Sequence, residues 1–90
     1  IRRIKDTAHT LHKPLQLDMF NGGGTDGGEA HKSRDGKPTA VSCLPVRYGH
    51  CAYSIAHLRD IVDAIDIFTE LIVNFDEEAY RTSTNFLKGV

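Results

Sequence analysis

Apolar side chains recur along the second half of the chain with the period of an α-helix. Starting at Ser54, they fall three or four residues apart, so the pattern predicts one long amphipathic helix over 54–74. Ser54 is the expected N-cap, because its hydroxyl can accept a hydrogen bond from a free backbone N–H. Leu58, Ile65 and Phe68 lie near the centre of the apolar arc and are the expected core. The residues that make up the arc are Ile55, Leu58, Ile61, Val62, Ile65, Phe68, Ile72 and Phe75.

The opposite face of this helix is polar, with one interruption. Ile67 breaks the polar face, which indicates a contact on a second side of the helix. Ile67 and Leu71 lie off the main stripe, and two-fold dimers are the commonest oligomers, so we expect a homodimer. The polar face itself is made of Arg59, Asp63, Asp66 and Glu70, with Asp60 on its flank.

Two shorter helices are expected near the ends of the chain. A three-four spacing of Ile1, Ile4, Ala8 and Leu11 predicts a helix over 1–12, which Pro14 would stop. Acidic residues at the positive end of a helix dipole favour a third helix over 76–88. Its expected core residues are Tyr80, Phe86 and Leu87, and Gly89 is its expected stop.

The middle of the chain carries signals of a small sheet. Alternation over 15–20 and the run Thr39–Val46 predict two strands, and the Asp35-Gly36 pair is typical of a hairpin turn. We therefore expect an α+β fold with a small antiparallel sheet from 15–20 and 39–46, forming one domain over 1–90. An all-α bundle with an irregular middle is the alternative.

Composition and charge narrow the picture further. Residues 1–50 carry eight Lys/Arg and five acidic residues, whereas residues 51–90 carry three and seven, so the two halves have opposite net charge. Such a split suggests two faces of different potential, and neither half alone implies a nucleic-acid or membrane ligand. No apolar run is long enough to cross a membrane, and no signal peptide is expected. With two cysteines, we expect free thiols and a cytoplasmic protein.

Candidate catalytic and metal-binding patterns are weak. Cys43, His50, Cys51 and His57 do not form the paired, closely spaced ligands of a structural zinc site. Cys51 lacks a recognisable third member of a nucleophilic site. The glycines of 22–27 fit a dinucleotide-binding pattern, but no helix that could pack behind them follows. We expect no catalytic residues, no metal and no cofactor.

One short motif points to a partner. Gln16-Leu17-Asp18-Met19-Phe20 resembles the peptide by which bacterial polymerases and replication regulators bind the sliding clamp. The usual form of that peptide is Gln-Leu-Ser/Asp-Leu-Phe, and here Met19 stands in place of leucine. The resemblance implies that Leu17, Met19 and Phe20 enter apolar pockets while Gln16 bonds at the rim.

The motif favours a non-enzymatic protein-interaction module. In its most specific version it is a bacterial or phage factor of DNA replication that docks on the sliding clamp. One alternative is a small nucleic-acid-binding regulator, in which Arg2, Arg3 and Lys5 contact phosphates. Another is an inhibitor of a DNA-binding enzyme that uses the acidic face of the long helix.

Overall fold

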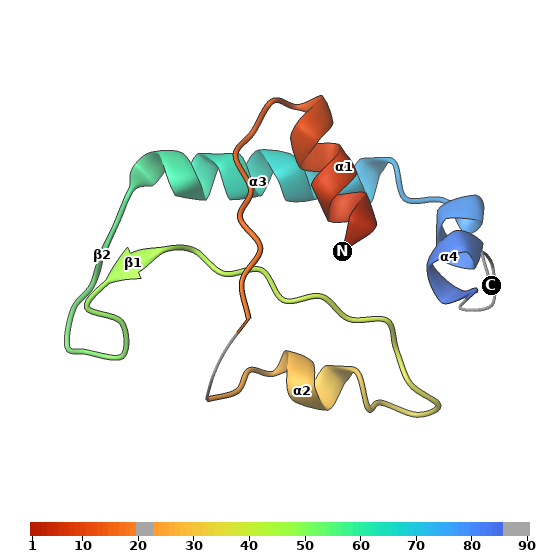
Figure 1. Ribbon diagram of the computed structural model, residues 1–90, viewed down its shortest axis with the longest axis horizontal. Helices are drawn as coiled ribbons and strands as arrows, with labels where there is room; N and C mark the ends of the chain where they lie inside the picture. Colours follow the sequence, from red (N-terminus) through yellow and green to blue (C-terminus); the bar gives the residue numbers. More distant parts are fainter. Residues whose placement is uncertain (20–22, 86–90) are drawn as a thin grey trace. The chain divides into compact units, whose positions relative to one another are not determined.

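The computed structural model describes residues 1–19 and 23–85 and has an α+β fold (Figure 1). This confirms the expected fold class, with a small antiparallel sheet beside helices. The predictions for Phe20, Phe86, Leu87 and Gly89 lie outside the described residues. In chain order the elements are α1 (Arg2–Thr10), α2 (Gly27–Ala30), β1 (Val46–Arg47), β2 (Ile55–Ala56), α3 (Leu58–Val73) and α4 (Glu77–Thr84).

The chain divides into two compact units. The first comprises Ile1–Gln16 and Ser42–Val73, and the second comprises Leu17–Val41 and Asn74–Val90. The first unit therefore holds α1, the sheet and α3, and the second holds α2 and α4. Each unit is described by itself, and the expectation of one domain over 1–90 stays a prediction.

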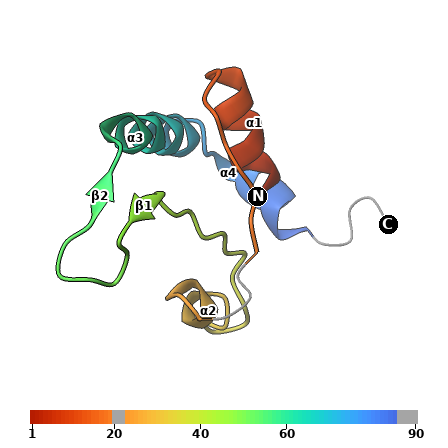
Figure 2. The same ribbon diagram turned by 60° about the vertical axis from the view of Figure 1, so that its left-hand side comes forward.

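In the first unit, α1 packs across α3 (Figures 1 and 2). Ala8 of α1 and Ile67 of α3 are buried there. The helix predicted over 1–12 is confirmed over Arg2–Thr10. It ends because His12 adopts a left-handed conformation, φ 56°, and the Lys13 N–H then donates to the Ala8 carbonyl at 2.9 Å.

The face of α3 that α1 covers is the polar one. Asp63 and Ile67 are each only 5% exposed, whereas Leu58 is 72% and Ile65 is 58% exposed, and Phe68 is half-buried. The prediction that Leu58 and Ile65 form the core is therefore wrong. Helical periodicity shows which side chains would gain from burial, but the position of the neighbouring helix decides which of them are buried. The second contact that Ile67 indicated is the contact with α1.

The helix predicted to begin at Ser54 begins four residues later. Residues Ile55–Ala56 are in β2, so the expected Ser54 cap is wrong. His57 takes that role, because its Nδ1 accepts the backbone N–H of Arg59 at 3.0 Å. Histidine is an uncommon cap, and for this bond Nδ1 must carry no proton.

Of the described residues predicted to form strands, only Val46 lies in the observed sheet. β1 and β2 are antiparallel, with Val46 opposite Ala56 and Arg47 opposite Ile55. Residues 15–19 and 39–45 are not in strands, so both strand predictions are wrong for the described residues. Alternation alone does not make a strand, because the backbone N–H and C=O groups need a partner strand that these segments do not find.

In the second unit, α4 begins where it was expected, whereas the Asp35-Gly36 pair does not form the expected hairpin turn. The Asp76 carboxylate accepts the Ala79 N–H at 2.8 Å and caps α4. Ala79 is buried and Tyr80 is exposed, so the core prediction for Tyr80 is wrong. At the Asp-Gly pair, the Gly36 N–H donates to the Ser33 carbonyl at 2.9 Å, in a turn that follows α2 and joins no strands.

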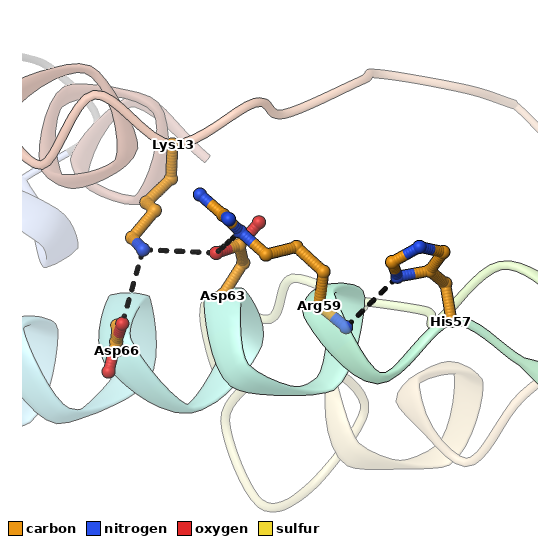
Figure 3. A network of polar contacts seen from close by, with 5 residues as sticks. All are labelled: Lys13, His57, Arg59, Asp63 and Asp66. Atoms are coloured by element: carbon orange, nitrogen blue, oxygen red, sulfur yellow. Dashed lines mark hydrogen bonds and ion pairs between the residues drawn. The ribbon is translucent and has the colours of Figure 1, made fainter.

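Lys13 compensates the buried carboxylate of Asp63 (Figure 3). Its Nζ lies 3.0 Å from Asp63 Oδ1 and 3.3 Å from Asp66 Oδ2, and the Arg59 Nε lies 3.5 Å from Asp63 Oδ1. Within residues 1–19 and 23–85, that oxygen accepts no well-aligned hydrogen bond, so ionic attraction is what offsets its burial. The close ion pairs with Asp63 and Asp66 raise the pKa of Lys13 above its ordinary value of 10.5. Asp63 belongs to the polar face predicted from the sequence, and it is nevertheless buried.

The covered face of α3 can be tested by two matched substitutions. Ile67→Ala should lower the free energy of unfolding by about 2–5 kcal/mol, because Ile67 is buried against α1. Ile65→Ala removes the same atoms from an exposed position and should cost about 0.5 kcal/mol or less. Chemical denaturation of both variants measures the difference. Equal losses, or a larger loss at Ile65, would contradict the packing described here.

The ion pair can be tested by charge removal and by pH. Lys13→Met should destabilise the chain because it leaves the buried Asp63 with only the exposed Arg59 as a positive neighbour, and adding Asp63→Leu should recover stability. The more exposed Asp66 provides the control, since Asp66→Asn should change the unfolding free energy by about 1 kcal/mol or less.

The pH dependence of the same pair has a defined sign. A raised lysine pKa means that its stabilisation is complete below pH 10.5 and is lost as the pH rises through the folded-state value. Lys13→Met should lack this alkaline loss. An identical alkaline profile for the two proteins would show that the bond contributes nothing to stability.

Candidate functional site

The segment between β1 and β2, residues 48–54, contains two strained backbone positions. Tyr48 and His50 are left-handed, with φ of 66° and 58°, on either side of Gly49. A left-handed conformation is unfavourable for a bulky residue such as tyrosine. Among the described residues, the other non-glycine cases are His12 and Arg34, which lie in the turns that follow α1 and α2. No helix ends at Tyr48 or His50, and strain of this kind gathers at functional sites.

Three local contacts hold the 48–54 loop in shape. The β1–β2 pairing closes its base. Above the base, the rings of Tyr48 and Tyr53 meet edge to face, with centroids 6.0 Å apart and planes at 67°. Across the turn, the Cys51 thiol donates to the Gly49 carbonyl at 3.4 Å. The strained turn is therefore fixed at both ends by its own residues.

The 48–54 loop presents an imidazole and a thiol to solvent. His50 and Cys51 are both exposed, and Cys51 and Cys43 are free thiols. Histidine can move a proton near neutral pH or bind a metal through a ring nitrogen. Over 1–19 and 23–85, no three His, Cys, Asp or Glu side chains are grouped so as to hold a metal ion. An ion bound at His50 would need further ligands from outside these residues.

The motif residues 16–19 lie in an extended segment without regular structure. Leu17 and Met19 are exposed, and the Met19 N–H donates to the Asp18 carboxylate at 2.8 Å. Gln16 is also exposed, and Phe20 lies outside the described residues. Exposure is a property of most extended segments, so it does not by itself identify a partner.

The three basic residues proposed to contact phosphates lie on α1. Arg2 and Lys5 are exposed and Arg3 is half-buried. Zinc-ligand spacing and nucleophile patterns do not predict the strained loop that carries His50 and Cys51. The adjacent Tyr-Gly-His was the signal available, since a glycine between two polar aromatic residues suits a tight turn.

Comparison with known proteins gives a match over most of the chain. The family model of the M42 glutamyl aminopeptidases matches residues 1–67. A protein of Acetivibrio thermocellus named "Putative aminopeptidase" is 32% identical over 69 residues, which are 77% of this chain and 21% of that protein. "Putative aminopeptidase SgcX" of Escherichia coli is 35% identical over 71 residues, 79% of this chain and 19% of that protein.

The chain spans about a fifth of the length of these relatives. The matched residues include α1, β1, the 48–54 loop, β2 and the first half of α3. No solved structure gives a significant match. Over the described residues, no helix is long and apolar enough to cross a membrane.

The family match overturns the function predicted from the five-residue motif. A short peptide motif recurs by chance, whereas a match over 67 residues depends on the whole pattern of the chain. Clamp docking, a role in DNA replication and both non-enzymatic alternatives are therefore wrong, as is the prediction that the protein is not an enzyme. The chain belongs to the M42 glutamyl aminopeptidase family of peptidases.

Proposed function

We propose that this chain forms part of an aminopeptidase, an enzyme that hydrolyses the first peptide bond of a peptide and releases its N-terminal residue. The observation that carries the proposal is the family match over residues 1–67. Two relatives whose names describe aminopeptidases support it.

Within this chain, His50 is the residue that we propose to face the reacting centre. Peptide hydrolysis needs a group that activates water and a group that stabilises the developing negative charge. An imidazole can serve either need, directly or as a ligand of an ion. The fixed loop supports this role, because the Tyr48–Tyr53 pair and the Cys51–Gly49 bond hold the turn that carries His50. A catalytic group is most effective when its position is set before the substrate binds.

The proposed compartment is the cytoplasm. Cys43 and Cys51 are both free and exposed, and exposed thiols of this kind persist in a reducing compartment.

A chimera of the A. thermocellus relative tests the activity. The 69 aligned residues of that protein are replaced by those of this chain, and release of N-terminal residues from fluorogenic peptides is measured against the unaltered relative. We expect the chimera to keep activity and to lose roughly 10²–10⁴-fold in kcat/KM on His50→Ala.

The control in the same assay is His9→Ala on α1. His9 is also exposed, but it lies in the last turn of α1 and away from the strained loop. Its substitution should leave kcat/KM unchanged. If the relative is active but a folded chimera shows no activity, or if His50→Ala and His9→Ala behave alike, the proposal for this chain fails.

A further inference from the structure

The face of α3 away from α1 is an exposed aliphatic stripe. Leu58, Val62, Ile65 and Ile72 lie on it at helical spacing, and Leu58 and Ile72 are both at least 70% exposed. Figure 2 looks nearly along α3 and shows α1 to one side of it. The helix is thus covered on the side that carries Asp63 and uncovered on its most apolar side.

An exposed apolar stripe on a helix is energetically unfavourable in water. Burial of aliphatic surface is the main favourable term in folding, and a helix normally turns its apolar stripe to the core. Here α1 is held on the other face by Ile67 and by the ion pair of Lys13 with Asp63. A continuous exposed apolar stripe marks an interaction surface. No charged residue interrupts it between Leu58 and Ile65 along one edge of the helix, so its partner must be apolar as well.

The small sheet also exposes aliphatic side chains that a further contact would cover. Val46 of β1 and Ile55 of β2 are at least half exposed, and each strand has only two residues. A two-stranded ribbon is marginally stable by itself and gains stability from a further strand or from packing against another element. The sheet and α3 therefore both leave aliphatic surface uncovered within the same unit.

We propose that the aliphatic stripe of α3 is an internal interface of an M42 peptidase, covered by an apolar surface from the part of the enzyme that lies outside the matched segment. The relatives supply the argument for this occupant, since roughly four-fifths of their length lies outside the matched segment. In this arrangement α3 lies between two neighbours, with α1 on the Asp63 face and the remainder of the peptidase on the Leu58–Ile65 face. The proposal rests on family membership and does not depend on the proposed activity.

Thiol labelling in two contexts tests the interface. In a background with Cys43→Ser and Cys51→Ser, Ile65→Cys is placed both in the 90-residue chain and in the chimera described above. The reaction with a maleimide should be fast in the chain, where Ile65 is 58% exposed. In the chimera it should be slower by about tenfold or more, because the site must open locally before it reacts.

Ile67→Cys is the matched control, because α1 covers it in either context. It should react slowly in both proteins. Equal rates for Ile65→Cys in chain and chimera would overturn the proposal. The proposal would also be overturned if the 90-residue chain sedimented as a dimer that Ile65→Glu dissociates and Ile65→Met does not. The stripe would then be covered by a second copy of the chain.

A second measurement covers a chimera that fails to fold. Carbene footprinting of the intact A. thermocellus relative labels exposed side chains without any substitution. The helix aligned with α3 should be protected on both faces there, and heavy labelling of the face aligned with Leu58 and Ile65 would overturn the proposal. An inactive chimera with a protected Ile65 would contradict the proposed activity and support the interface, so the two failures are distinguishable.

Discussion

The ion pair between Lys13 and Asp63 is the interaction on which the first unit depends. An aspartate with 7% of its side chain exposed is tolerated only where a positive charge lies close to it, and Lys13 Nζ is 3.0 Å away. Lys13 follows directly after the turn that ends α1, so the pair fixes the end of α1 against the middle of α3. Ile67, one helical turn beyond Asp63, adds the apolar part of the contact. This pairing turns the aliphatic side of α3 outwards.

The outward orientation of the aliphatic face of α3 is consistent with membership of a family of longer proteins. A helix with one face held by a short neighbouring helix and the other left apolar is suited to a position inside a larger protein. The relatives are about five times as long as the matched segment, and the sheet that precedes α3 is likewise small and exposed. The strained 48–54 loop is different, since its own aromatic pair and β1–β2 base hold it. The described chain thus combines a locally fixed loop with a helix that has an apolar face free for a further contact.

Local signals in the sequence predicted α1, α3 and α4, but not the four-residue α2. The three-four spacing located α1 and α3, and the acidic run at Asp76 located the start of α4, because each signal acts within one or two turns of backbone. The faces of α3 could not be predicted, since the buried position of Asp63 depends on Lys13, fifty residues earlier in the chain. The strand predictions were wrong for the same reason, because strand pairing also depends on residues that are distant in the sequence. Leu17 and Met19 alternate as strand residues do, but only Val46–Arg47 and Ile55–Ala56 find each other.

Most of the candidate site could not be predicted from the sequence. His50 and Cys51 match neither the spacing of zinc ligands nor a nucleophilic triad, so those patterns do not identify them. The left-handed backbone at Tyr48 and His50 is a property of the folded loop. The motif at Gln16–Phe20 led to a wrong function, because a five-residue pattern is far less specific than a family match over 67 residues.

The central claim is that α1 covers the Asp63–Ile67 face of α3 and leaves the Leu58–Ile65 face open. Methyl NOE spectroscopy of the 90-residue chain tests it most directly. We expect cross-peaks from the Ile67 methyl groups to side chains of α1 and none from the Ile65 methyl groups. Cross-peaks from Ile65 to α1, with Ile67 free of them, would contradict it.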